Sequence, residues 1–177
     1  PVTARTIEWA ATPLHAMYVI VPRGQQQRSF LPDGTLAGKT FTAKYGYVGI
    51  SVENDAFVME GINEAGLGVG LFYFPQYGEY QPYDPQKKEQ SVSDMQLAAW
   101  ILSSFASINE LQAAMPQIRV IATDPRASTV HWRITESSGR QVVLEIVNQH
   151  VHFYENPLGV LTNSPDFGLH LTNLNNY

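Results

Sequence analysis

The stretch Ile62-Asn63-Glu64-Ala65-Gly66-Leu67-Gly68-Val69-Gly70-Leu71-Phe72-Tyr73-Phe74 predicts two antiparallel β-strands joined by a tight turn. Its central residues, 63–66, have the composition of a turn, and the apolar and aromatic residues on either side suit strands. Similar runs precede it at 45–53 and 57–61. We therefore expect these segments to form an antiparallel meander.

Glycines at positions 66, 68 and 70 superficially resemble a dinucleotide-binding loop. Such a loop follows a strand and opens a helix, whereas these glycines lie inside a strand pattern that no helix follows. We interpret them as small residues in a closely packed strand. The sequence therefore gives no reason to expect a nucleotide cofactor.

A helical region separates two groups of strands. Ser91 or Ser93 can cap a first helix, whose apolar residues recur at helical spacing. Ser107 and Glu110 have the spacing of a capping box and predict a second helix, which a proline then ends. Further strands are expected at 17–21, 119–121, 131–135, 141–147 and 151–154, with polar loops at 25–39 and 75–90. The order of elements indicates an α+β protein with antiparallel sheet.

The composition is that of a globular chain. The 177 residues suit one domain, with 44% hydrophobic and 15% charged residues. The net charge is -5 and the basic residues are scattered, which argues against a nucleic-acid partner or an anionic membrane surface. No apolar stretch approaches the length of a membrane span. A small molecule is therefore the expected partner.

Several common catalytic sites have no support in the sequence. No Gly-x-Ser-x-Gly motif or phosphate-binding loop is present. His150 and His152 share one face of a short strand without a further ligand at metal-binding spacing, so we expect no metal. Ser164 and His170 are poor candidates for a nucleophile and its base, because Ser164 precedes a proline and suits a turn. We expect no cofactor.

Four segments, in this order along the chain, share a pattern. They are Ala4-Arg5-Thr6-Ile7-Glu8-Trp9, then Glu60-Gly61-Ile62-Asn63-Glu64-Ala65-Gly66-Leu67, then His131-Trp132 with Asn156-Pro157-Leu158-Gly159-Val160, and finally Leu161-Thr162-Asn163-Ser164-Pro165 continuing to Tyr177. Together they resemble the choloylglycine hydrolase family, which includes bile salt hydrolases and penicillin V acylases. The last segment is the most specific.

The resemblance implies a fold and an assembly. Members have the four-layer αββα sandwich of N-terminal-nucleophile hydrolases, with antiparallel sheets, and are commonly homotetramers. Residues 1–177 would be the N-terminal part of one such domain, lacking its start and its C-terminal part. Members without a leader are cytoplasmic, and some others are periplasmic or secreted, so we expect a cytoplasmic protein with export as the alternative.

The resemblance also implies a mechanism. Members use an N-terminal cysteine whose α-amino group acts as the base, and this chain contains no cysteine. We therefore expect the nucleophile to precede Pro1. Asn163 matches the asparagine whose side chain donates to the oxyanion, although an asparagine in a turn is the alternative. The backbone N–H of Tyr73 would be the second donor, and a core aromatic residue is the alternative there.

Two charged residues match positions beside the nucleophile. Arg5 corresponds to an arginine that would favour the thiolate, and a surface ion pair is its alternative. Glu8 stands where many members carry an aspartate that binds the α-amine, so its longer side chain is a departure. In a regular strand Arg5 and Glu8 would face opposite sides. Both can therefore line one site only if the strand ends or bulges near Ile7.

The substrate is the least determined part of the expectation. By resemblance, the pocket walls would include Ile7, Ala11, Met17, Phe57 and the Tyr73 side chain. The leading hypothesis is hydrolysis of glycine- or taurine-conjugated bile acids, and penicillin V or another acyl amide is the alternative. Tyr73 favours the alternative, because several penicillin V acylases carry tyrosine there and bile salt hydrolases often carry asparagine. A non-catalytic binding protein on the same scaffold is the remaining hypothesis.

Overall fold

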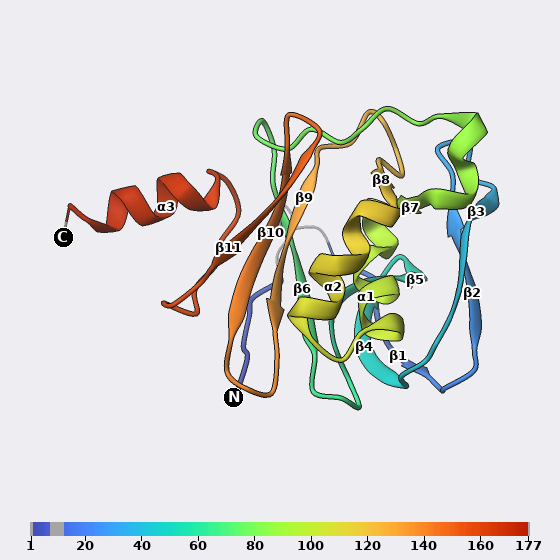
Figure 1. The fold of residues 1–177 in the computed structure, drawn as a ribbon, viewed down its shortest axis with the longest axis horizontal. Helices are drawn as coiled ribbons and strands as arrows, with labels where there is room; N and C mark the ends of the chain where they lie inside the picture. The colour runs from blue at the N-terminus through green and yellow to red at the C-terminus, as the bar shows by residue number, and fades with distance from the viewer. Residues whose placement is uncertain (1, 8–12, 177) are drawn as a thin grey trace.

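A seven-stranded antiparallel sheet forms the centre of the molecule (Figure 1). The computed structural model describes residues 2–7 and 13–176. The strand order in the sheet is β1-β4-β5-β6-β9-β10-β11, and every neighbouring pair runs antiparallel. These strands span Ala16–Val21 (β1), Tyr47–Val52 (β4), Asn54–Asn63 (β5), Gly68–Tyr73 (β6), Val130–Thr135 (β9), Gln141–Val147 (β10) and His150–Glu155 (β11). The α+β class expected from the sequence is confirmed.

The predicted turn between β5 and β6 is organised by one asparagine. The Asn63 side-chain oxygen accepts hydrogen bonds from the backbone N–H groups of Ala65 and Leu67 at 3.1 and 3.0 Å. Its amide nitrogen donates to the carbonyls of Leu102 and Phe105. Asn63 therefore closes the hairpin and ties it to the helical layer, as turn asparagines do.

Helices α1 and α2 lie over one face of the sheet (Figure 1). They span Leu97–Ser104 (α1) and Ile108–Ala114 (α2), with short 3₁₀ turns η1 (Pro85–Gln90), η2 (Asp94–Gln96) and η3 (Met115–Gln117). A Cβ on Gly61 would meet the Leu102 side chain of α1 at 2.7 Å, so a larger residue would force that side chain to shift where helix and sheet approach closely. The core between them contains the fully buried side chains of Leu97, Ile101, Leu102, Trp132, Ile134 and Leu144.

The helix boundaries confirm one expected cap and correct another. Ser107 caps α2, since its hydroxyl accepts the Glu110 N–H at 3.2 Å. Ser93, one of the two residues expected there, is the N-cap residue of η2, which leads directly into α1, but its side chain makes no capping hydrogen bond. Ser91 caps no helix, because it lies in β7 (Ser91–Ser93), which pairs in parallel with β8 (Arg119–Ile121). This pairing is between segments far apart in sequence, so local spacing could not reveal it.

Two other elements differ from the expectation. Residues 25–39 are largely β-hairpin rather than loop, with β2 at Gln26–Phe30 and β3 at Leu36–Thr42. Their polar residues are compatible with strands because the buried Ser29 hydroxyl bonds to Gln96. The chain also contains an unexpected C-terminal helix, α3 (Phe167–Leu174), capped by Asp166 through the Leu169 N–H.

The face of the sheet opposite the helices is partly open. Exposed apolar residues of β1, β4 and β5 lie together on this face, because residues paired across neighbouring strands point to the same side of a sheet. Ile20 of β1 pairs with Val48 of β4, which pairs with Ile62 of β5. The Tyr18 and Ile20 side chains are 89% and 79% exposed. The described residues thus show a helical layer and one large sheet, which are two of the four layers expected.

Tyr47 gives the fold a testable pH dependence. Burial raises the pKa of its phenol to about 12, while the hydrogen bond to Gln27 acts in the opposite direction. The unfolded phenol ionises near pH 10, so the stability due to this group is complete below pH 10 and is lost as the pH rises to 12. We expect the complete protein to lose roughly 2 kcal/mol more unfolding free energy between pH 8 and 12 than its Tyr47→Phe variant. Urea unfolding at both pH values measures this, and equal losses would contradict it.

Candidate active site

The candidate site begins where the pairing of β5 and β6 stops. The last paired residues are Glu60 and Gly70. The Phe74 N–H donates to the Thr129 carbonyl, on the side of β9. Backbone groups of successive residues in a strand point to alternate sides, so those of Leu71 and Tyr73 point to the other side, where β5 no longer pairs with β6. These groups would be unpaired if nothing replaced the missing strand.

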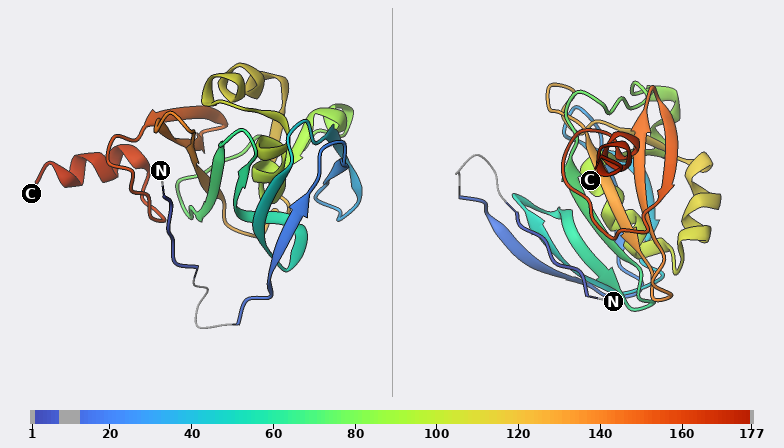
Figure 2. Two further views of the ribbon diagram at one scale, coloured as in Figure 1. Left: turned by 90° about the horizontal axis from the view of Figure 1, so that it is seen from below. Right: turned by 90° about the vertical axis from the view of Figure 1, so that its left-hand side faces the viewer.

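Arg5 occupies that position. Its Nη1 donates to the Leu71 carbonyl at 2.6 Å and to the Met59 carbonyl at 3.1 Å. The guanidinium also lies 4.3 Å from the ring centroid of Phe72, a cation–π contact. Residues 2–7 form no strand, as the extended N-terminal segment in Figure 2 shows. The arginine is therefore held by carbonyls of two strands rather than by an ion pair on the surface.

A row of side chains crosses three strands beneath Arg5. Glu60 of β5, Gly70 of β6 and Arg133 of β9 stand opposite one another in the sheet register. Because Gly70 has no side chain, Glu60 reaches across β6 and accepts a hydrogen bond from Arg133 at 2.7 Å. A Cβ on Gly70 would collide with the Glu60 carboxylate and lie 3.2 Å from Arg133. The glycine is required for this contact.

The Glu60 carboxylate thus contacts the guanidinium groups of both Arg5 and Arg133. Arg5 Nη1 lies 3.6 Å from Glu60 Oε2, which is an ion contact too long for a good hydrogen bond. Burial lowers the pKa of Arg5, partly offset by Glu60, while the nearby Arg133 acts in the same direction as burial. Burial also raises the pKa of Glu60, against the effect of the two arginines. Arg5 is a partly buried cation, oriented by two carbonyls and in ion contact with this carboxylate.

Asn163 contacts β6 at Tyr73, two residues after Leu71, whose carbonyl accepts the hydrogen bond from Arg5. Its side-chain Oδ1 accepts the Tyr73 N–H at 3.1 Å. A backbone N–H only donates, so the amide must turn its oxygen toward Tyr73 and keep its nitrogen as the donor. The Tyr73 phenol donates to Ser128 at 2.9 Å. The structure therefore joins residues 90 positions apart in the sequence and fixes the orientation of one amide group.

Neighbouring residues fix the backbone around Asn163. The Ser164 hydroxyl donates to the Pro75 carbonyl at 2.8 Å. His170 Nε2 lies 3.0 Å from the Asn163 carbonyl and donates to it. Ser164 and His170 thus each bond to a backbone carbonyl, which agrees with a structural role and not with a nucleophile and base.

The comparison with protein families decides the relationship. A model described as linear amide C–N hydrolases, choloylglycine hydrolase family, matches residues 1–177. The chain belongs to the choloylglycine hydrolase family. The resemblance inferred from its four sequence segments is confirmed.

Relatives of known sequence include proteins named for two substrates. The chain is 32% identical to a bile salt hydrolase/transferase of Clostridium perfringens over 78% of its own length and 44% of that protein. It is 28% identical to a penicillin V acylase of Pectobacterium atrosepticum over 100% of its length and 48% of that protein. The chain thus spans about half the length of these relatives.

Solved structures agree with the fold. A crystal structure of a conjugated bile acid hydrolase variant from Clostridium perfringens superposes with a TM-score of 0.77 at 29% identity, covering 92% of this chain and 50% of that one. The penicillin V acylase from Agrobacterium tumefaciens gives a TM-score of 0.77 at 24% identity, covering 95% and 50%. The second likeness concerns the fold alone.

The residues predicted from the choloylglycine hydrolase pattern fall into three groups. Arg5, Tyr73 and Asn163 are brought together along β6. Phe57 packs edge-on against Phe30 of β2, and Met17 lies on the face of β1 opposite Tyr18. Half-buried Ile7 follows Arg5 closely in the chain, whereas Glu8 and Ala11 lie outside the described residues.

Sequence reasoning missed Glu60 and Arg133. Glu60 opens the second family segment, but a strand glutamate on a polar face usually points to solvent. Their contact depends on the register of three strands and on the glycine between them. Counting outward from the turn between β5 and β6 could have paired Glu60 with Gly70. It could not have shown that Arg133 of β9 would lie on the other side of Gly70.

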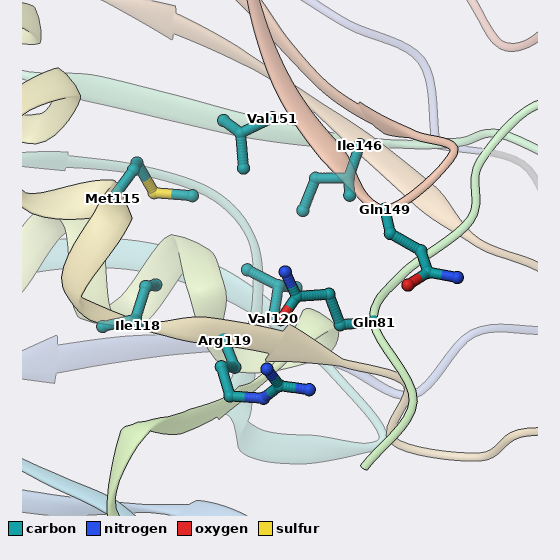
Figure 3. A pocket seen from close by; sticks show the side chains of 8 residues that line it. All are labelled: Gln81, Met115, Ile118, Arg119, Val120, Ile146, Gln149 and Val151. Carbon is teal, nitrogen blue, oxygen red and sulfur yellow. The ribbon is translucent and has the colours of Figure 1, made fainter. Parts of the chain in front are cut away.

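One small, partly open pocket lies away from this site. A cavity of about 20 Å³ lies between the β10–β11 hairpin and β8, lined by Gln81, Met115, Ile118, Arg119, Val120, Ile146, Gln149 and Val151 (Figure 3). It is large enough for about one water molecule. Among residues 2–7 and 13–176, no group of three His, Cys, Asp or Glu could hold a metal, and no helix is long and apolar enough to cross a membrane.

Proposed function

We propose that this chain is part of an amide hydrolase in which Asn163 stabilises the oxyanion and Arg5 orients the nucleophile. The contact between Tyr73 N–H and Asn163 Oδ1 carries the proposal, because it leaves the amide nitrogen Nδ2 as a donor of fixed direction. A fixed donor stabilises developing negative charge without the reorganisation that water would need. The Tyr73 N–H orients Asn163, and as the second donor it would be shared between the Asn163 oxygen and the oxyanion, so that Nδ2 keeps its direction.

The nucleophile would be a cysteine at a mature N-terminus that precedes Pro1. Its thiol attacks the amide carbonyl while its α-amino group takes the thiol proton. The tetrahedral intermediate collapses to an acyl-enzyme, and the amine leaves with that proton. Water then attacks the thioester, which releases the carboxylic acid and regenerates the thiol. The α-amino group has a reference pKa near 8, which suits proton transfer at neutral pH.

Arg5 contributes a cation whose direction is set by the Leu71 and Met59 carbonyls. A fixed positive charge beside a cysteine favours the thiolate. Glu8 would bind the α-amine in place of an aspartate, and its additional methylene must be accommodated by the backbone.

Conjugated bile acids are the proposed substrates, with penicillin V or another acyl amide as the alternative. The bile salt hydrolase/transferase of Clostridium perfringens, 32% identical, supports the first. Tyr73 supports the second through its pattern in the family. Its phenol donates to Ser128, which holds the ring at the end of β6, where the Tyr73 N–H contacts Asn163.

Tyr73→Asn tests the substrate assignment in the complete protein. We expect the variant to raise the ratio of taurocholate to penicillin V hydrolysis at least threefold, because the smaller side chain removes an aromatic wall. Release of taurine and of 6-aminopenicillanic acid measures the two rates. Phe105→Leu, at an aromatic packed edge-on against Trp100 in the helical layer, is the control and should leave the ratio unchanged. An unchanged ratio in Tyr73→Asn would contradict the assignment.

We further propose that residues 1–177 belong to a larger single domain, assembled as a homotetramer and located in the cytoplasm, with export as the alternative. The exposed apolar residues Tyr18, Ile20, Val48 and Ile62 support the first point, since monomers rarely leave such patches uncovered. A non-catalytic binding protein is the competing function. Identification of the first residue of the mature protein separates them, because only cysteine, serine or threonine can act as the nucleophile.

A further inference from the structure

Two titratable side chains that the proposed mechanism does not use are completely buried beside the site. His131 of β9 and Glu145 of β10 have 0% side-chain exposure, and His131 Nδ1 lies 3.0 Å from Glu145 Oε1. The imidazole stacks on Phe74 with 4.3 Å between ring centroids and 9° between planes. Phe74 directly follows Tyr73, so the pair underlies the strand end that contacts Asn163.

The pair is bonded to both ends of the segment that carries Asn163. His131 Nε2 lies 3.0 Å from the carbonyl oxygen of Thr162, the residue before Asn163. Glu145 Oε1 accepts the Phe167 N–H at 3.0 Å, at the start of α3. Helix α3 projects away from the sheet beyond β11 (Figure 1), so these bonds attach its first turn and the preceding segment to the body of the protein.

The protons in these contacts can be counted. A carbonyl oxygen only accepts, so His131 Nε2 must carry a proton for the bond to Thr162. The contact between Nδ1 and Oε1 needs a second proton, located on either atom. The Phe167 N–H supplies a third to the same Oε1. All three bonds therefore form only when histidine and glutamate together hold two protons.

We propose that His131 and Glu145 are positioning residues that set the place of the Asn163 amide through the Thr162 carbonyl and the Phe167 N–H. The inference rests on the proposed function, in which Asn163 donates to the oxyanion. The amide is fixed from two directions: Tyr73 N–H holds its oxygen, and the buried pair holds the backbone from which it extends.

Glu145→Gln tests this role with almost no change in volume. A neutral glutamine cannot accept from both Phe167 N–H and Nδ1–H while a neutral imidazole keeps Nε2–H, so one of the three bonds is lost. Misplacement of a reacting group by about 1 Å can cost about a hundredfold in rate. We expect kcat of the complete protein to fall roughly 10- to 100-fold with KM changed less than about threefold. Glu155→Gln, at an exposed ion pair with Arg140, is the matched control and should leave kcat unchanged.

A double-mutant cycle distinguishes positioning from general damage. If Glu145 acts through Asn163, Glu145→Gln will cost much less in the Asn163→Ala background than in the native protein. An equal cost in both backgrounds overturns the inference and leaves the proposed function intact. An Asn163→Ala variant with unchanged turnover refutes the oxyanion role itself.

A second pair of variants covers poor folding of Glu145→Gln. His131→Gln keeps an N–H that can donate to Thr162, whereas His131→Phe removes it. We expect His131→Gln to retain at least fivefold more kcat than His131→Phe, and equal values would overturn the inference. Should the native protein prove inactive, a crystal structure of Glu145→Gln decides: Asn163 Oδ1 still bonded to Tyr73 N–H, with the Thr162 carbonyl unmoved, would overturn it, and displacement of both would support it.

Discussion

Asn163→Ala should reduce amide turnover of the complete protein by about 100- to 1000-fold, with little change in the free energy of unfolding. Losing one oxyanion donor typically costs roughly 2.7–4 kcal/mol of transition-state stabilisation. Among residues 2–7 and 13–176, this side chain has one hydrogen bond, from the Tyr73 N–H, and the neighbouring bonds of Ser164 and His170 remain after the substitution. Steady-state kcat and urea unfolding measure the two effects separately.

The control for this prediction is another exposed amide. Asn109→Ala on α2 removes an acceptor for Arg140 on the helix side of the sheet. It should leave kcat within twofold of the native value. If Asn163→Ala and Asn109→Ala had equal kcat, Asn163 would be a turn residue and the oxyanion proposal would be wrong.

Glu60→Ala should have the largest effect on stability. It leaves two guanidinium groups, with 7% and 14% of their side chains exposed, without the carboxylate between them. Removing one partner of a buried ion pair costs about 3–5 kcal/mol, and the 20% exposure of Glu60 favours the lower end, about 3 kcal/mol. Activity should fall as well, because Arg5 loses its counter-ion.

Glu64→Ala provides the matched comparison at the end of the same hairpin. Glu64 pairs with Arg23 where both side chains are substantially exposed, so its removal should destabilise the protein far less. Urea unfolding of the two variants gives the difference directly. Equal losses for Glu60→Ala and Glu64→Ala would show that the row formed by Glu60, Gly70 and Arg133 does not stabilise the fold.

Local chemistry explains which elements the sequence could predict. The Asn63 turn and the Ser107 cap were predictable because each depends on hydrogen bonds within a few residues. The β2–β3 hairpin was not, because its buried polar group, Ser29, depends on Gln96, which lies 67 residues away. The parallel pairing of β7 with β8 was missed for the same reason.

The candidate site divides in the same way. Arg5, Tyr73 and Asn163 were found through their resemblance to family motifs, which carry information that single residues lack. Glu60, Arg133 and the buried pair were not found, because their roles arise from strand register. His131 belonged to a recognised segment, yet nothing local to it indicated that Glu145 would lie beside it. Side-chain contacts between neighbouring strands depend on strand register, which a single sequence does not specify.

Hydrolysis by the complete protein distinguishes an amide hydrolase that uses Asn163 from a non-catalytic protein on the same scaffold. Purified protein is incubated separately with taurocholate and penicillin V, and the released amine is measured for the native protein and for Asn163→Ala. We expect the native protein to release amine from at least one substrate and Asn163→Ala to lower that rate at least a hundredfold. No amine release by the folded native protein from either substrate, or release that Asn163→Ala leaves unchanged, would contradict it.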